Sequence, residues 1–344
     1  MTKRVFRRQF LKNTTRVVAG ISLSSWMIAG EQNADPYAEL KSRKYLGKVK
    51  IETRIPDDST FSEGPAVDRS GNVYFTNIPA NKIYKWDPSK KDLSVFRENT
   101  HSANGLRFNP QGDLLVCESG TGSVIKIDMK NGARKVLADS FQGKGIQSPN
   151  DLDFDNRGNI YFSSRTNEPD AERENKRGLY LIDSSGYIRL LIYEPDVQMP
   201  NGVVVSPNDA TLYLIEAHPG ADYNRKILAF DLNERGDLSN QRVLYDFYPG
   251  RSGDGMCIDA KGNLYVAAGL HKTRNTSETL DTKPGIHVIS PKGELLAFRE
   301  TPEDTITNCT FGGKDLKTLY ITCGSLLLSI RTRIPGKASY LPNG

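Results

Sequence analysis

The chain repeats one short pattern six times, at intervals of roughly fifty residues. Each copy reads as an apolar strand, a tight turn of the Asp-x-x-Gly-Asn type and a second apolar strand, and the glycine supplies the positive φ that such a turn needs. A repeat of this length is typical of architectures in which similar units complete one another's cores. The six copies span residues 63–75, 104–116, 150–162, 201–213, 254–266 and 308–321.

A third apolar strand follows most hairpins, as at residues 82–87 and 226–231, and a fourth completes the unit, as at residues 190–193. Four antiparallel strands per repeat indicate a propeller blade, so the sequence predicts an all-β, six-bladed β-propeller. The sixth repeat lacks a fourth strand after residues 326–334. The unassigned apolar segment at residues 48–53 is predicted to supply it, which would close the ring and cover two strand edges. A pair of β-sandwiches is the alternative.

The positive charge of the chain is concentrated at its start. Of the 46 Lys and Arg residues, six lie in residues 1–30, which contain no acid. The net charge of +5 therefore becomes −1 for the rest of the chain. A protein without a global basic field is a poor candidate for binding nucleic acid, so no nucleic-acid partner is expected.

Residues 1–34 are predicted to be an export signal with its cleavage region. The run Arg7-Arg8-Gln9-Phe10-Leu11-Lys12 is similar to the twin-arginine signature of bacterial export, and the apolar stretch after it is too short to span a bilayer. We expect a periplasmic or secreted protein, exported by the twin-arginine machinery and not stably inserted in a membrane. Residues 35–46 would then be a linker, 47–335 the propeller and 336–344 a C-terminal tail.

Four cysteines fall within the predicted propeller: Cys117, Cys257, Cys309 and Cys323. None forms a C-x-x-C pair, so a zinc or redox motif is not indicated. Cys309 and Cys323 could lie on neighbouring strands and form a disulfide in an oxidising compartment. Buried free thiols are the other possibility, and folding in the cytoplasm before export would favour them.

Alignment of the repeats places one oxygen-bearing side chain at the start of every innermost strand. In a propeller these strands line the central channel, so the six side chains would converge at one mouth of it. Carboxylate and amide oxygens without sulfur or imidazole suit a hard divalent cation such as Ca²⁺, Mg²⁺ or Mn²⁺. The alternative is that each Asn or Asp before Gly is only a turn residue. The six positions are Glu63, Asn104, Asn150, Asn201, Asp254 and Asn308.

Four segments in this column resemble the SMP-30/gluconolactonase/luciferin-regenerating-enzyme family, and the likeness runs from about residue 50 to 330. The resemblance implies one divalent cation, Ca²⁺ as the first candidate and Mg²⁺, Mn²⁺ or Zn²⁺ as others, held by Glu63, Asn201 and Asp254. The segments are Ser62-Glu63-Gly64-Pro65, Ser148-Pro149-Asn150-Asp151-Leu152, Met199-Pro200-Asn201-Gly202 and Gly253-Asp254-Gly255-Met256.

The resemblance also implies roles for individual residues. Asn150 would be a fourth ligand or a substrate contact, Asp254 the general base, and Glu168 a contact to a sugar substrate. Animal members carry an Arg where this chain has Ser148, which leaves the exact substrate open. Asn104, Arg165, His101 and His218 are further candidates for substrate contacts.

The implied function is hydrolysis of a small lactone, such as gluconolactone. A cation would polarise the carbonyl, and Asp254 would accept a proton from the attacking water. No Gly-x-Ser-x-Gly motif is present, which argues against an acyl-enzyme route. Hydrolysis of another ester or a phosphotriester at the same site, and a non-catalytic propeller that binds a ligand, are the alternatives.

Overall fold

The computed structural model describes residues 35–166 and 171–337. The chain divides into two units, Met1–Ala38 and Glu39–Gly344, and every strand of the described residues lies in the second. The predicted export signal at residues 1–34 lies outside the described residues. Within the described ranges, no helix combines the length and apolar character needed to cross a bilayer.

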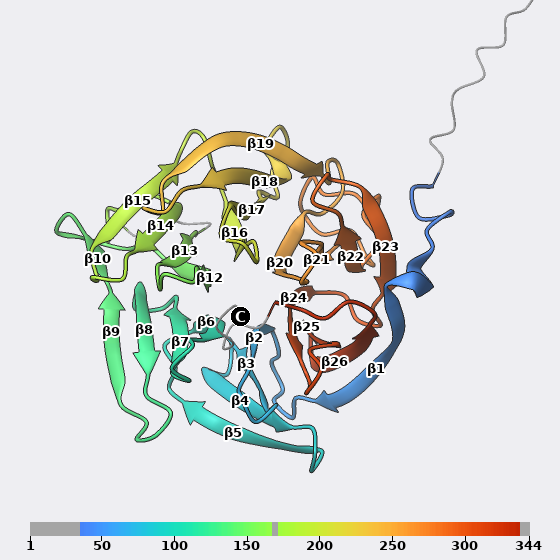
Figure 1. Cartoon of the computed structure of the whole chain (residues 1–344), viewed down its shortest axis with the longest axis horizontal. Coiled ribbons are helices and arrows are strands. Elements are labelled where there is room, and N and C mark those ends of the chain that lie inside the picture. The colour runs from blue at the N-terminus through green and yellow to red at the C-terminus, as the bar shows by residue number, and fades with distance from the viewer. Residues whose placement is uncertain (1–34, 167–170, 338–344) are drawn as a thin grey trace, which may run out of the picture. The chain divides into compact units, whose positions relative to one another are not determined.

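The second unit is an all-β propeller of six four-stranded antiparallel sheets around a central axis (Figure 1). This confirms the predicted fold class. Blade one contains β2 (Ser62–Val67), β3 (Val73–Asn77), β4 (Lys82–Asp87) and β5 (Asp92–Glu98). Blade two contains β6 (Ala103–Phe108), β7 (Leu114–Glu118), β8 (Ser123–Ile127) and β9 (Arg134–Ala138). Blade three contains β12 (Pro149–Phe154), β13 (Ile160–Ser164), β14 (Gly178–Ile182) and β15 (Ile188–Tyr193). Blade four contains β16 (Pro200–Val205), β17 (Thr211–Ala217), β18 (Arg225–Leu232) and β19 (Leu238–Asp246). Blade five contains β20 (Gly253–Ile258), β21 (Leu264–Ala268), β22 (Gly285–Ile289) and β23 (Leu295–Glu300). Outside the blades lie the 3₁₀ turn η1 (Ser42–Lys44) and the hairpin of β10 (Ser140–Phe141) and β11 (Lys144–Gly145).

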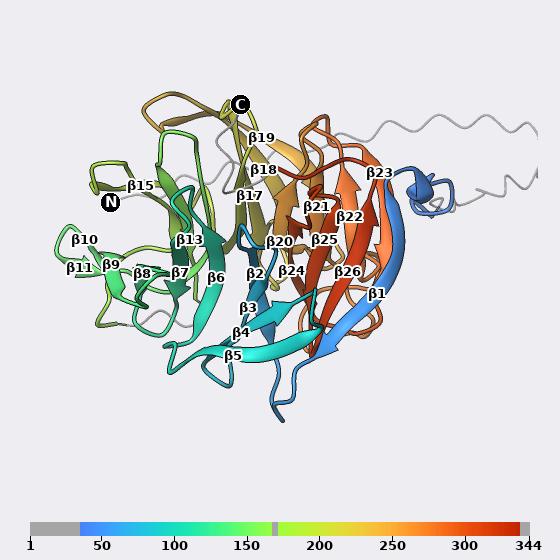
Figure 2. The same ribbon diagram turned by 60° about the horizontal axis from the view of Figure 1, so that its bottom comes forward.

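The sixth blade is built from both ends of the propeller sequence. It contains β24 (Ile306–Gly312), β25 (Thr318–Cys323) and β26 (Leu326–Thr332), and its outermost strand is β1 (Leu46–Arg54). Strand β1 runs antiparallel to β26, with Val49 opposite Ile330 and Arg54 opposite Leu326 (Figures 1 and 2). The predicted closure of the ring by an N-terminal strand is confirmed, and no blade is left with three strands.

The first hairpin of three blades uses the same turn. Asp68 Oδ1 accepts hydrogen bonds from the backbone N–H groups of Ser70 and Asn72, both at 2.9 Å. Gly71 adopts φ 87°, which an L side chain rarely allows. The Asn72 amide donates back to Asp68 Oδ2 at 2.8 Å. Asp155 with Asn159, and Asp259 with Asn263, repeat these contacts, so the Asp-x-x-Gly-Asn motif forms a rigid hairpin turn.

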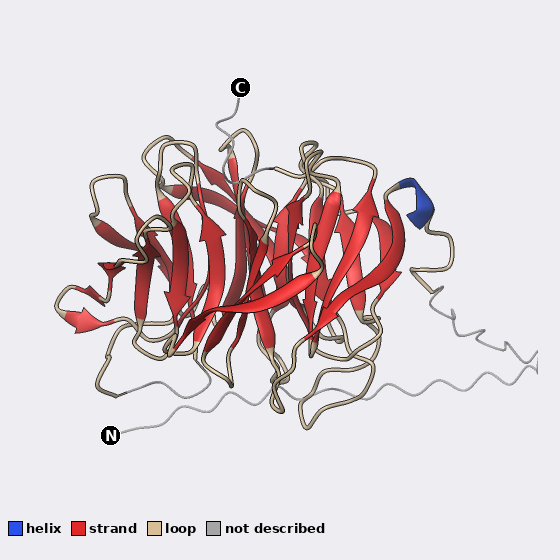
Figure 3. Ribbon diagram, turned by 90° about the horizontal axis from the view of Figure 1, so that it is seen from below, coloured by secondary structure: helices blue, strands red, loops and turns tan. Residues whose placement is uncertain are grey.

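The core lies between neighbouring blades around the ring. Innermost strands β2, β16 and β20 are buried along their whole length, whereas outermost strands such as β5, β15 and β19 contain only half-buried and exposed residues. Aromatic rings bridge adjacent blades, as where Tyr74 of blade one meets Phe108 of blade two edge-on, with ring centroids 5.2 Å apart. The strands run between two loop-bearing faces, as the side view shows (Figure 3). This packing fixes the inner strands that carry the site.

Candidate active site

The six predicted column positions lie at or near the start of the inner strands, where the pairing of each strand is interrupted. In β2 the register with β3 shifts between Glu63 and Ala66, and β20 shifts in the same way between Gly253 and Met256. The other four inner strands carry an equivalent shift. Bulges of this kind re-aim side chains and are frequent beside active sites. The column residues therefore lie in a strand bulge or directly beside one, and not in a turn.

The glycine that follows most column residues is required by the close approach of neighbouring inner strands. A Cβ on Gly105 would lie 2.7 Å from the carbonyl oxygen of Asn150, and one on Gly202 would lie 2.8 Å from that of Asp254. Gly64 also has a positive φ of 49°. The Asn-Gly and Asp-Gly pairs are thus explained by packing around the axis, which brings the column side chains together.

These residues surround a cavity of about 470 Å³. Five of the six column residues line it, together with residues from loops at the same end of the channel. The volume lies within the roughly 300–1,000 Å³ typical of small-molecule sites. The lining residues with charged or amide side chains are Glu63, Asn104, Asn150, Arg165, Asn201, Arg251, Asp254, Arg274 and Glu278.

Two acids of this cavity lie in a buried setting. Glu63 is 4% exposed and Asp254 is 8% exposed. Burial raises the pKa of Glu63 well above its ordinary value, and the negative charges of Asp254 and Asp151 raise it further. The backbone N–H of Gly64 donates to Glu63 at 3.2 Å and offsets only part of this effect. The carboxylates of Glu63 and Asp254 therefore repel each other unless a positive charge lies between them.

Asp254 is held on both of its oxygens. Oδ1 accepts a hydrogen bond from the Asn201 amide at 2.6 Å, and Oδ2 accepts one from Arg251. Arg251 is anchored in turn by the carbonyl oxygens of Ile306 and Gly269. These contacts fix the Asp254 carboxylate at the cavity while each oxygen keeps a second lone pair.

Comparisons with known proteins identify the family. The family model described as the SMP-30/Gluconolactonase/LRE-like region matches residues 61–325. The chain belongs to this family. It is 30% identical over 308 residues to the gluconolactonase of Zymomonas mobilis, covering 82% of this chain and 81% of that protein.

Solved structures show the same fold. A gluconolactonase from Xanthomonas campestris aligns with a TM-score of 0.69 and 23% identity, over 85% of this chain and 98% of that one. A calcium-binding protein, regucalcin, from Agrobacterium tumefaciens aligns with a TM-score of 0.66 and 17% identity, over 86% of this chain and 96% of that one. This SMP-30/gluconolactonase member thus has the propeller of its structural relatives.

The sixth column residue, Asn308, does not line the cavity. Its amide nitrogen donates across the channel to Asp151 Oδ2 at 3.2 Å, and its Oδ1 accepts the Cys309 N–H at 2.8 Å. Asp151 follows Asn150 on β12, and burial raises its pKa to about 6 although Arg107 opposes the rise. The hydrogen bond between Asn308 and Asp151 therefore links two inner strands across the channel, outside the cavity lining.

Three other candidates from the sequence fall elsewhere. His101 has φ 52° and its carbonyl oxygen accepts the Gly120 N–H, but its side chain does not line the cavity. His218 stacks on Tyr223, with ring centroids 3.7 Å apart, next to the lining residue Pro219. Glu168 lies outside the described residues.

Sequence reasoning missed one arginine of this site, Arg251, and placed another, Arg274, only within the polar segment 268–284. Arg251 precedes Asp254 by three residues, and Arg274 comes from the long loop before β22. Arg251 could have been found from its place next to the Gly253-Asp254 motif. Arg274 lies in the segment 268–284, whose length and polarity indicate either a solvated loop or a substrate lid over the mouth of the channel.

The donors at the cavity fit a hard divalent cation. The described part of the chain contains no cluster of three or more His, Cys, Asp or Glu side chains of the kind that holds a metal unaided. The site instead combines two carboxylates, Glu63 and Asp254, with the amides of Asn150 and Asn201. An Asn201 amide turned over would offer its oxygen. A cation between the acids would also relieve the repulsion that raises the pKa of Glu63.

Proposed function

We propose that this protein hydrolyses a small lactone, in the first instance a sugar lactone such as gluconolactone, with the help of one divalent cation. The observation that carries the proposal is the pair of buried acids, Glu63 and Asp254, lining one cavity together with two amides. The gluconolactonase of Zymomonas mobilis supports the reaction class, and the calcium-binding regucalcin of Agrobacterium tumefaciens supports the cation.

Glu63, Asn150, Asn201 and Asp254 would hold the cation, with Ca²⁺ the first candidate. When bound, it supplies a positive charge that polarises the lactone carbonyl. Glu63 serves as an anionic ligand only. Asn104 and Asn150 line the cavity and offer amide groups to the hydroxyls of a sugar ring.

Asp254 is proposed to accept the proton of the attacking water and to return it to the leaving ring oxygen. Arg251 and Asn201 hold its carboxylate in one orientation, so the proton acceptor is positioned before substrate binds. Ring opening then yields a hydroxy acid, which releases one proton as its new carboxyl group ionises.

The test is hydrolysis of glucono-δ-lactone by the purified chain, followed as acid release in a pH-stat after subtraction of the spontaneous rate. We expect activity that EDTA abolishes and that Ca²⁺, Mg²⁺, Mn²⁺ or Zn²⁺ restores to different extents. Asp113→Asn, in the equivalent hairpin of blade two and outside the cavity lining, is the matched control for Asp254→Asn. Activity that EDTA leaves unchanged would contradict the role of the cation.

The same assay separates the alternative substrates. A carboxylic ester such as p-nitrophenyl acetate and a phosphotriester should be hydrolysed more slowly than the lactone. Faster turnover of either would assign the site to that substrate class. If none of the three is turned over under any metal condition, the propeller is a binding protein and the proposed reaction is wrong.

We infer from the Arg7-Arg8 run that the protein is exported in a folded state by the twin-arginine machinery to the periplasm or beyond. Replacing both arginines by lysine should leave folded, active protein in the cytoplasm. Unchanged accumulation outside the inner membrane would rule out this signal. The control is a variant with Lys3 and Arg4 replaced by Gln, which keeps the motif.

A further inference from the structure

Arg165 is the one cavity-lining arginine whose guanidinium makes no hydrogen bond or ion pair within the described structure. It comes directly after β13, and its backbone N–H donates to the carbonyl oxygen of Ser148 at 3.0 Å. Its side chain lines the cavity. Arg225, by contrast, is fully buried and donates to the carbonyl oxygens of His218, Pro219 and Gly220.

The surroundings of Arg165 do not compensate its charge. Burial lowers the pKa of its guanidinium, and the attraction of Asp254 and Glu63 only partly offsets that effect, while Arg251 adds repulsion. Arg165 is half-buried, so its charge is partly removed from water, and a bound anion would offset that cost. A guanidinium presents five N–H donors in a planar fork that matches a carboxylate or a phosphate.

The charge of the whole cavity leads to the same expectation. Its ionisable lining residues are three arginines and three acids, so it is close to neutral by itself: Arg165, Arg251 and Arg274 against Glu63, Asp254 and Glu278. A divalent cation at the proposed site would make the cavity positive by two charges. The oxyanion that forms during lactone opening balances one of them. A second negative charge on the ligand would balance the other.

We propose that the natural substrate is an acidic lactone, which carries a carboxylate or phosphate group that Arg165 binds at the cavity wall. The inference rests on the proposed lactone hydrolysis. Arg165 would act as a specificity-determining residue, holding the acidic substituent while Asp254 acts at the ring. Arg274, exposed on the loop before β22, adds positive charge on the route into the cavity.

The first experiment compares three lactones under the best metal condition: neutral glucono-δ-lactone, D-glucaro-1,4-lactone with a carboxylate, and 6-phosphoglucono-δ-lactone with a phosphate. We expect kcat/KM for one acidic lactone to exceed that for the neutral lactone at least about tenfold, as suits a charge-assisted bidentate contact. Whichever acidic lactone is preferred identifies the anionic group. Equal or better turnover of the neutral lactone would overturn the proposal.

Variants then test the residue. Arg165→Gln should remove the preference for the acidic lactone while changing kcat/KM for glucono-δ-lactone less than about threefold, and Arg165→Lys should keep part of the preference. Arg189→Gln is the matched control, because Arg189 lies on β15 of the same blade and pairs with Asp237 away from the cavity. A loss of equal size for acidic and neutral lactones in Arg165→Gln would show a general structural role and would contradict the inference.

Binding of the open-chain acids makes the result independent of turnover. D-glucarate and D-gluconate differ by one carboxylate, and calorimetric titration of the chain with each should show tighter binding of glucarate, lost in Arg165→Gln. If no lactone is hydrolysed but this difference persists, the proposed reaction fails and the anion site stands. If the lactone is hydrolysed but the two acids bind equally, the anion site fails and the proposed reaction stands.

Discussion

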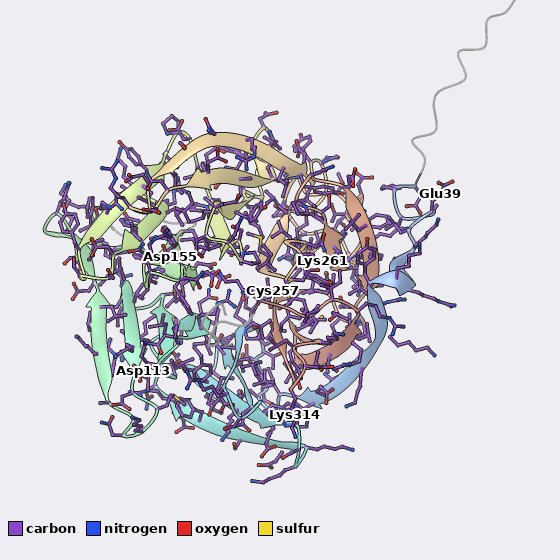
Figure 4. All side chains as sticks on the ribbon, viewed as in Figure 1. Glu39, Asp113, Asp155, Cys257, Lys261 and Lys314 are labelled. Carbon is purple, nitrogen blue, oxygen red and sulfur yellow. The ribbon has the colours of Figure 1, made fainter. Side chains whose placement is uncertain are left out.

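The two ends of the central channel are built by the same six inner strands, and both contain buried arginines and acids. At one end these groups surround the cavity of about 470 Å³. Arg107 and Asp153 lie three residues after the cavity residues Asn104 and Asn150, which is about 10 Å at the usual strand rise. They line a void of only about 10 Å³. Lys337, from the segment after β26, completes this sealed end. Cys257, also there, lies near the centre of the ring in Figure 4.

The difference is whether the charges have partners. At the sealed end Arg107 Nε lies 3.2 Å from Asp153 Oδ1, and Asp153 Oδ2 accepts the Val205 N–H at 2.8 Å. Burial would lower the pKa of Arg107, but Asp153 and Asp151 outweigh it, so that pKa is raised. The pKa of Arg165 at the open end is lowered. The sealed end therefore holds its arginine in an ion pair, whereas the open end leaves Arg165 without a hydrogen bond or ion pair in the described part of the chain.

The largest expected effect separates the two ends by activity. Asp254→Asn removes the proposed proton acceptor and should lower kcat at least about a hundredfold. Asp153→Asn, the same change on inner strand β12 at the sealed end, should change kcat less than about threefold, because Asp153 lies outside the cavity lining. Steady-state lactone kinetics across a metal titration measures both.

Glu63→Gln sharpens that result. It removes an anionic ligand but not the base, so its activity should partly recover at high metal concentration. If saturating metal rescues Asp254→Asn as fully as Glu63→Gln, Asp254 is a ligand only.

The free energy of unfolding should rank the two ends of the channel in the opposite order, with the larger loss at the sealed end. Asp153→Asn removes the ion-pair partner of Arg107 and leaves only Asp151 to offset its charge, so it should lower the free energy of unfolding by about 3 kcal/mol. Glu63→Gln removes a charge that Asp254 repels, so the metal-free protein should lose less than about 1 kcal/mol or gain stability. Urea unfolding in EDTA gives both values. Equal losses would mean that the open end is as well paired as the sealed one.

Glu216 extends the comparison to pH. This buried acid makes no ion pair in the described structure, and burial raises its pKa to about 7 although the N–H groups of Gln198 and Met199 donate to it. Because the unfolded chain releases this proton near pH 4.5, the contribution of Glu216 to stability falls as pH rises from about 4.5 to 7. Glu216→Gln should make the protein less sensitive to pH, by about 2–3 kcal/mol between pH 5 and 8. Urea titrations at both pH values test this; parallel pH profiles for the variant and the parent would refute it.

The smallest effect concerns the lysine of the sealed end. Lys337 Nζ donates to the Val205 carbonyl at 3.0 Å and lies 3.9 Å from Asp153. Lys337→Met keeps the packed methylene groups and should cost about 1 kcal/mol with no change in lactone kinetics. A thermal melt measures it. A loss as large as that of Asp153→Asn would show that Lys337, more than Arg107, balances the Asp153 charge.

The repeat made the fold and much of the candidate site predictable from the sequence. Equivalent residues in six blades must converge on one axis, so the column from Glu63 to Asp254 could be placed at one cavity. Contacts across the ring could not be derived in this way. Arg251 and Arg274 come from loops, and the partnership of Asn308 with Asp151 depends on the width of the channel.

The cysteines show the same limit. Cys309 and Cys323 lie on neighbouring strands as expected, but the register places Ile321 opposite Cys309 and Ile306 opposite Cys323. All four cysteines are free and buried. Cys309 instead lies 3.4 Å from Cys257 of the adjacent blade, sulfur to sulfur. The period of the repeat fixes the positions of residues within a blade, whereas side-chain contacts between blades depend on the distance between neighbouring blades.

The pairing of β1 with β26 has a consequence for biosynthesis. Residues 46–54 are made early and residues 326–332 late, so β1 has no β26 to pair with while roughly 270 residues are translated. At about 5–20 residues per second this interval lasts on the order of 15 to 60 s. Throughout it the nascent chain displays an unpaired strand at its leading end and open blades behind it. The ring can therefore close only after residues 326–332 have been made, and until then the free edges of β1 and of the last blade are open to pairing with other chains.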